Sequence, residues 1–320
     1  MTLVILIVIF GLLFDFTNGF HDAANVVATP IATKVIRPAV AIGFAALFNF
    51  VGATQISGVA ETIATGLVEQ ELASQTMVLA AVIGAIFWNL LTWYFGIPSS
   101  SSYALIGGLI GSALIGSGLK AVLWKGVIFK VLVPMVISPI LGYAVACGLM
   151  ALLLKISKKD RPFYKYFQIT SSAIVALSHG LNDAQKSMGI ITLGLFAAGL
   201  IQTPHIPLWV IGACAITMGL GTASGGFRII RTMGFEITSL KPIDGFAAES
   251  SSSIIMLFAS FLGIPLSTTH IIVGSITGVG AARDRRAVKW ATAHKMSIAW
   301  ILTLPGAALV SAIVFLVVSA

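Results

Sequence analysis

Long apolar stretches, separated by short polar loops, cover almost the whole chain. Most of them are long enough for a membrane-spanning helix, which needs about 20 predominantly apolar residues. The pattern therefore predicts an all-α, polytopic membrane protein. Its ten predicted segments lie at 2–29, 38–57, 76–95, 97–117, 130–154, 166–198, 207–226, 243–262, 265–281 and 296–318.

Two short motifs each occur twice, once in each half of the chain and in the same order. "NGFHDAANVVAT" (18–29) resembles "HGLNDAQKSMGI" (179–190). "GIPSSSSYALIGG" (96–108) resembles "GIPLSTTHIIVGS" (263–275). Internal repeats of this kind mean that each half is one structural unit.

The number of segments in each half sets the relative orientation of the two units. Each half contains five segments, an odd number, so the second copy enters the membrane from the opposite face. We therefore expect two inverted-topology repeats, at 1–154 and 166–320, joined by a cytoplasmic linker at 155–165. Transporters built this way bind substrate near the midplane, between broken or re-entrant half-helices.

Polar side chains recur at helical spacing inside the segments that carry the first motif. Residues spaced by three or four lie on one face of a helix. In the first half these residues are Asp15, Asn18, Asp22 and Asn25. In the second half they are His179, Asp183 and Lys186. Ionisable groups at membrane depth are costly and usually mark an ion or substrate path; a structural ion pair or an interfacial cap is the alternative.

The second motif predicts a site for an anion. Pro98 and Pro265 suit the first turn of a helix, and the hydroxyl residues after them suit its cap. The free N–H groups and the dipole of a helix start favour negative charge. The hydroxyl donors are Ser100, Ser101, Ser102, Ser267, Thr268 and Thr269. An ordinary capped span is the alternative, but carboxylates beside an anion site fit cation-coupled anion uptake.

Composition agrees with a membrane protein and excludes other classes. Hydrophobic residues make up 58% of the chain and charged residues only 9%, whereas soluble domains carry roughly 25% charged residues. The net charge of +8 does not indicate nucleic-acid binding, because Lys and Arg lie in short loops between segments. The positive-inside rule then places the 155–165 loop in the cytoplasm and both termini outside, with Lys120, Lys125 and Lys130 as exceptions.

Enzymatic and metal chemistry find little support in the sequence. The histidines have no metal-ligand spacing, and the serines lie outside any Gly-x-Ser-x-Gly elbow, so we expect neither a metal centre nor an enzyme. A channel remains the rival transport class. "GGLIGSALIGSG" (107–118) has small residues at helix-contact spacing, which serve packing inside the bundle or a contact in a homo-oligomer.

Taken in order, the motifs resemble the inorganic phosphate transporter (PiT) family in its short bacterial form. The matching stretches also include "ALSHGLNDAQK" (176–186), "GGFRIIRTMG" (225–234) and "GFAAESSSS" (245–253). The resemblance implies uptake of inorganic phosphate across the cell membrane by symport with sodium or protons, and no cofactor beyond the coupling cation. Some members of the family carry sulfate or a metal–phosphate complex.

The resemblance also implies roles for individual residues. It assigns Asp22, Asn25, Asp183 and Glu249 to coupling cations, and the two hydroxyl runs to phosphate. Lys186 departs from the sodium-type motif, because it stands where Asn25 stands in the first repeat. We expect its ammonium to replace a bound sodium ion, which would leave a proton as the coupling cation. The alternative is that Lys186 extends to the interface and contacts nothing.

Overall fold

The structure, a computed structural model, describes residues 1–55, 58–157 and 161–320. Within these ranges the secondary structure is helical apart from one isolated β-bridge, Val68–Val122, which confirms the all-α prediction. Parts of predicted segment 38–57 and linker 155–165 lie outside the described residues. The first half contains α1 (Thr2–Ala32), α2 (Pro38–Ala53), α3 (Gly58–Thr65), α4 (Gln75–Tyr94), α5 (Ser101–Ser117), α6 (Trp124–Val127) and α7 (Val133–Ile156). The second half contains α8 (Tyr164–Ala197), α9 (Leu208–Ser224), α10 (Phe227–Phe235), α11 (Pro242–Phe261), α12 (Thr268–Arg283) and α13 (Trp290–Ser319).

Several helices are long and apolar enough to cross a membrane. Among the described residues four qualify on their own: α1, α4, the continuous stretch Trp124–Ile156, and α13. Two bent pairs, α2 with α3 and α9 with α10, raise the total to six if each pair is one span. The helix α8 does not qualify because its middle is polar, and that middle carries the second copy of the aspartate motif.

Several predicted segment bounds differ from the structure; the last segment, for example, was predicted to start at 296, but α13 starts at Trp290. The helices α5 and α12 begin at Ser101 and Thr268, so Pro98 and Pro265 precede them instead of lying in their first turn. The helices begin there because the hydroxyls of the N-cap residues Ser100 and Ser267 each accept a hydrogen bond from a backbone N–H of the first turn. The segment predicted to start at 130 starts earlier, because α6 continues through a π-helical turn into α7.

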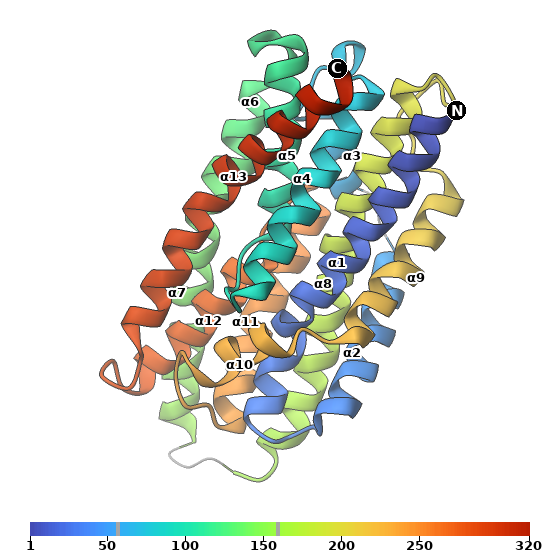
Figure 1. Cartoon of the computed structure of the whole chain (residues 1–320). Helices are drawn as coiled ribbons and strands as arrows, with labels where there is room; N and C mark the ends of the chain where they lie inside the picture. Colours follow the sequence, from blue (N-terminus) through green and yellow to red (C-terminus); the bar gives the residue numbers. More distant parts are fainter. Residues whose placement is uncertain (56–57, 158–160) are drawn as a thin grey trace.

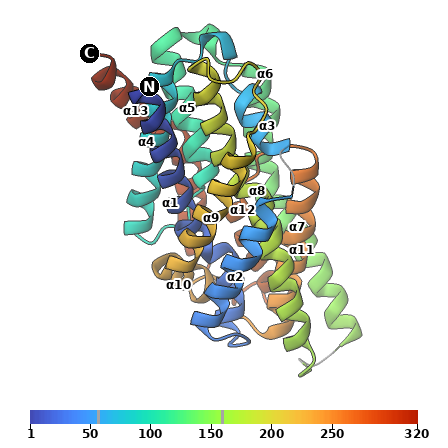
Figure 2. The same cartoon turned by 90° about the vertical axis from the view of Figure 1, so that its right-hand side faces the viewer.

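Corresponding helices of the two halves pack against each other reciprocally. Helix α1 packs on α9 as α8 packs on α2, and α5 packs on α13 as α12 packs on α7. Helix α1 starts at the end of the bundle that holds both chain termini, whereas α8 starts at the opposite end (Figure 1; Figure 2). The two copies of the aspartate motif therefore lie on helices that run in opposite directions.

The apolar core leaves a polar layer between two large clusters. One cluster includes α4 and α5 and ends on α1 at Phe14; the other includes α11 and α12 and begins on α1 at Ala24. On α8 the same two clusters are separated by the polar stretch 178–187. The buried polar residues of α1 and α8 thus lie at the same depth of the bundle.

Glycines allow the closest helix crossings. A Cβ atom on Gly52 of α2 would collide with the carbonyl of Leu177 on α8, and one on Gly221 of α9 would collide with the carbonyl of Phe16 on α1. Residues Gly107 and Gly111 of α5 face backbone carbonyls of α13 in the same way. The small-residue run 107–118 therefore serves packing inside the bundle.

Replacing Gly52 with Ala should destabilise the protein, because overpacking at a rigid backbone contact typically costs about 1–3 kcal/mol. Gly43→Ala is the matched control on the same helix, since nothing lies within 4 Å of a Cβ atom there. Thermal unfolding in detergent should show a lower melting temperature for Gly52→Ala only. Equal melting temperatures for the two variants would contradict the packing argument.

Candidate functional site

The starts of α5 and α12 meet inside the bundle. The hydroxyl of Ser102, in the first turn of α5, donates to the carbonyl of Leu266 at 3.2 Å, just before α12. Ser100 and Ser267 serve as caps, because their hydroxyls accept from Tyr103 N and His270 N at 3.2 and 3.3 Å. The two Gly-Ile-Pro motifs thus come together, with both helix N-termini directed into the polar layer.

Lys186 joins α8 to this meeting point. Its side chain is fully buried, and its ammonium lies 2.5 Å from Asp183 Oδ1. The same ammonium donates to the hydroxyl of Ser102 and, at 3.1 Å, to the carbonyl of Leu266. The alternative that Lys186 reaches the interface is therefore wrong.

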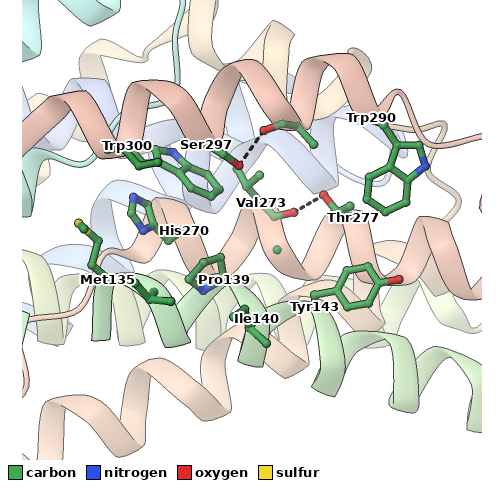
Figure 3. A pocket seen from close by; sticks show the side chains of 14 residues that line it. Met135, Pro139, Ile140, Tyr143, His270, Val273, Thr277, Trp290, Ser297 and Trp300 are labelled. Atoms are coloured by element: carbon green, nitrogen blue, oxygen red, sulfur yellow. Dashed lines mark hydrogen bonds between the residues drawn. The ribbon is translucent and has the colours of Figure 1, made fainter. Parts of the chain in front are cut away.

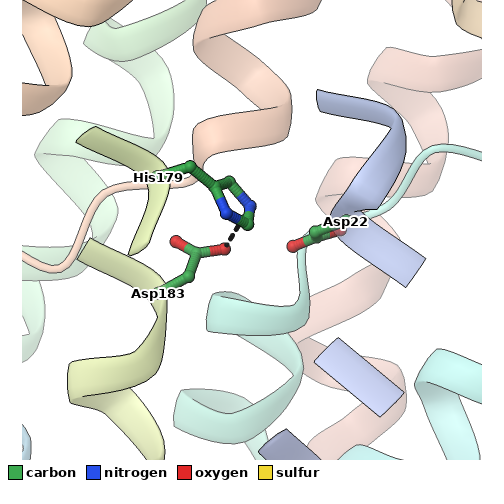
Figure 4. A group of neighbouring side chains, drawn as sticks. All are labelled: Asp22, His179 and Asp183. Carbon is green, nitrogen blue, oxygen red and sulfur yellow. Dashed lines mark ion pairs between the residues drawn. The ribbon is translucent and has the colours of Figure 1, made fainter. Parts of the chain in front are cut away.

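The carboxylates of Asp22 and Asp183 face each other across the centre, with His179 beside them (Figure 4). One ligand atom from each of these three residues lies within 4.8 Å of the other two. His179 Nε2 is 3.2 Å from Asp183 Oδ2, and His21 Nδ1 is 2.7 Å from Asp22 Oδ1. Carboxylate and imidazole ligands suit a cation, so this trio is a place where a cation fits although the sequence predicts no metal site.

Asn25 connects the carboxylates to the hydroxyls of the second motif. Its amide nitrogen donates to Thr268 Oγ1 and to Thr269 Oγ1, each at 3.0 Å. Thr268 in turn donates to Asp183 Oδ2 at 3.2 Å, and Thr269 to Asp22 Oδ1 at 3.5 Å. The carbonyl oxygen of Asn25 has no hydrogen bond to any described residue, so it remains available to a ligand.

Ser101 differs from the other hydroxyls of its run. Its side chain is fully buried, yet its Oγ makes no hydrogen bond within the described parts of the chain. Ser100 and Ser102 are both engaged, by a cap and by Lys186. Among the three residues predicted for the first hydroxyl run, Ser101 is the one whose hydroxyl makes no hydrogen bond to a described residue.

Glu249 lies in a separate cluster and not among the residues that surround Asp22 and Asp183. Thr29 and Gln168 donate to its Oε1 at 2.6 and 3.1 Å. Ser171 and Ser172 donate to its Oε2 at 2.5 and 2.9 Å. Sequence reasoning missed these α8 donors, although their polar types at the start of an apolar segment were a usable signal.

A second missed feature is a hydrogen-bonded chain behind Asp22. His21 Nε2 lies 3.1 Å from Thr92 Oγ1, and the Ser99 hydroxyl donates to Thr92 Oγ1 at 2.8 Å. This chain fixes the His21 ring against the end of α4. Spacing along α1 alone could not reveal it, because Thr92 is 71 residues away.

A groove of about 420 Å³ lies elsewhere, between α7, α12 and α13 (Figure 3). Its lining is mostly apolar, and His270 stacks on Trp300 with ring centroids 4.1 Å apart. A charged ligand would find few polar partners there. The polar layer around Asp22 and Asp183 is therefore the better candidate site.

Comparisons with known proteins agree with one another. The model of the "Phosphate transporter family" matches residues 18–162 and 155–311. A probable low-affinity inorganic phosphate transporter of Rhizobium meliloti is 43% identical, over 95% of this chain and 93% of its own length. One of Bacillus subtilis, with the same name, is also 43% identical, over 99% and 97%. A solved structure entitled "The sodium-dependent phosphate transporter" matches with a TM-score of 0.90 at 28% identity, over 100% of this chain and 99% of that one.

Lys186→Met should lower stability by about 3 kcal/mol, because removing one partner leaves a buried charge uncompensated. The double variant Lys186→Met with Asp183→Asn should recover part of that loss, since no charge is then left alone. Thermal unfolding of the two variants and the parent measures this difference. A single variant as stable as the parent would show that the pair does not hold the site together.

Proposed function

Because the chain belongs to the phosphate transporter family, we propose that it takes up inorganic phosphate across the cell membrane by symport with protons. The two halves act as inverted repeats, 1–154 and 166–320, around the centre that Asp22 and Asp183 form. Their reciprocal packing and the opposite directions of α1 and α8 support this. Both termini, which share one end of the bundle, lie on the outer side of the membrane, and residues 155–165 lie in the cytoplasm.

The anion site is formed by the first turns of α5 and α12. Two helix N-termini concentrate N–H groups and positive potential at one place. Ser101, Thr268 and Thr269 supply hydroxyls, and Ser102 positions the Lys186 ammonium there. This is a suitable environment for a tetrahedral oxyanion.

Phosphate fits this environment better than sulfate, the second candidate. A hydrogen phosphate ion carries an O–H group that can donate to a carboxylate, which only accepts when it is ionised. Asp22 and Asp183 are such carboxylates, directly beside the hydroxyls. Sulfate has no proton to donate and would meet them as a like charge.

The observation that carries proton coupling is the environment of the Lys186 ammonium. Asp183 Oδ1, Ser102 Oγ and Leu266 O surround it, and a small cation would choose the same kinds of oxygen atom. In the first repeat the neutral Asn25 stands at the matching position. A fixed ammonium takes the place of one carried sodium ion, so the coupling cation is a proton. Sodium coupling is the rival mechanism, since the structural relative is named as sodium-dependent.

A metal–phosphate complex is the alternative cargo. Asp22, His179 and Asp183 place three ligand atoms within 4.8 Å of one another, and a divalent ion that enters with phosphate would meet them there. The ammonium of Lys186 already lies at Oδ1 of Asp183. Its positive charge would repel a divalent metal ion bound beside it. Bare phosphate is therefore the preferred cargo.

Liposomes containing the purified protein should accumulate labelled phosphate when a proton gradient is imposed, and replacing sodium with choline should change nothing. Lys186→Asn should lose proton-driven uptake, because the second repeat then lacks its fixed cation. Flux under a proton gradient and under a sodium gradient, with sulfate as competitor, is the measurement. Strict sodium dependence of the unmodified protein would rule out the proton mechanism.

Ser101→Ala should weaken phosphate binding about tenfold or more, because a hydrogen bond to a charged group contributes roughly 1.5–3 kcal/mol. Its stability should stay close to that of the parent, since Ser101 makes no hydrogen bond within the described residues. Ser100→Ala is the contrasting variant, because it loses a helix cap that contributes about 1 kcal/mol. Binding titrations and thermal unfolding separate the two effects. Unchanged affinity in Ser101→Ala would remove this hydroxyl from the phosphate site.

A further inference from the structure

Asp15 is a buried carboxylate that the candidate site does not use. It lies on α1 seven residues before Asp22 and on the same face, with Asn18 between them. Its side chain is fully buried, and neither of its oxygens makes a hydrogen bond to a described residue. The rise of a helix puts it about 10 Å from Asp22 along the axis, toward the end that holds both termini (Figure 1).

The other buried carboxylates of the polar layer all have partners. Asp183 has Lys186 at 2.5 Å and His179 at 3.2 Å, and Asp22 has His21 at 2.7 Å. Glu249 accepts four hydrogen bonds from neutral donors. Among the ion pairs of the described residues, none includes Asp15.

The surroundings of Asp15 offer neutral polar groups and no counter-charge. The hydroxyl of Ser187 of α8 and the backbone of Met218 of α9 lie beside it, and its titratable neighbours are Asp183 of α8 and Cys214 of α9. The hydroxyl of Ser187 and both amide atoms of Asn18 are buried and make no hydrogen bond to a described residue. An ionised carboxylate there would be unpaired and close to a second negative charge, which is costly at membrane depth.

A proton removes this cost in the simplest way. The carboxylate accepts one proton and becomes a neutral acid, whose O–H and carbonyl groups match the amide of Asn18 and the hydroxyl of Ser187. The step moves one proton and no electrons. Asp22 and Asp183 are less suited to it, because their carboxylates already have partners, His21 at Asp22 and Lys186 with His179 at Asp183.

We propose that Asp15, with Asn18 and Ser187, is the binding site of the coupling proton, separate from the centre at Asp22 and Asp183. This inference rests on the proposed proton symport. Asp15 takes up a proton on the side of the termini and releases it on the other side during each cycle. The phosphate centre keeps its ion pairs meanwhile.

The variant Asp15→Asn tests this, because its amide imitates the neutral acid but cannot release a proton. It should still exchange labelled phosphate between the two sides of a liposome at equal concentrations, yet fail to accumulate phosphate under a proton gradient. Asp15→Glu keeps a carboxyl group and should accumulate phosphate under a proton gradient. Cys214→Ser, which changes a neighbour of Asp15, should behave like the parent. Proton-driven accumulation by Asp15→Asn at the parent's level would overturn the inference and leave the proposed function intact.

An infrared measurement separates this inference from the proposed function. The parent should show the carbonyl stretch of protonated carboxylic acids, and Asp15→Asn should show a weaker band than the parent, whereas Asp22→Asn should show the parent's band. This band does not depend on which gradient drives uptake or on whether a variant transports. A parent driven only by sodium would overturn the proposed function, and the same band in Asp15→Asn as in the parent would overturn the assignment to Asp15.

Discussion

An unpaired charge inside a membrane protein is costly, and in this chain the Lys186 ammonium that pairs with Asp183 on α8 also contacts both halves of the site. Asp183 and Lys186 are both fully buried, and breaking such a pair costs about 3–5 kcal/mol. The remaining donors of Lys186 bind Ser102 at the start of α5 and the carbonyl of Leu266 before α12. One ammonium therefore contacts the place where two helices from different halves, α5 and α12, begin. The caps, the hydroxyls and the carboxylates are arranged around it.

The two halves share an architecture but differ in their chemistry. Asp22 and Asp183 correspond, yet Asn18 stands where His179 stands, and Asn25 where Lys186 stands. Counting fourteen residues back from each Gly-Ile-Pro motif, Val82 takes the place of Glu249. The repeated parts form the scaffold and the helix starts, whereas the differing residues change the charge and the hydrogen-bonding groups at matching positions. The two copies of a motif can therefore occupy matching places in the packing and still present different chemistry.

Local patterns made much of this predictable. Apolar runs predicted the helices, and the repeated motifs predicted roles for Asp22, Asp183 and the two hydroxyl runs, which the fold brings close together. The starts of α5 and α12 were predicted four and three residues too early, because caps at Ser100 and Ser267, not the prolines, set them. The partners of Glu249 and the contact between Lys186 and Ser102 join positions about 80 residues apart. Such contacts depend on how the helices pack against one another, and the spacing of residues along one helix gives no information about that packing.

The buried ammonium of Lys186 also bears on the energetics of a cycle. A cation that enters with its cargo moves charge through the membrane potential, and each elementary charge yields about 2.3 kcal/mol per 100 mV. A cation that belongs to the polypeptide stays where it is when the cargo leaves. It lowers the electrostatic cost of holding an anion, but it contributes nothing to the concentration ratio that the carrier can sustain. In the proposed mechanism, where Lys186 replaces a carried sodium ion, the transporter gains less energy from the membrane potential. In return, its site needs one bound ion fewer.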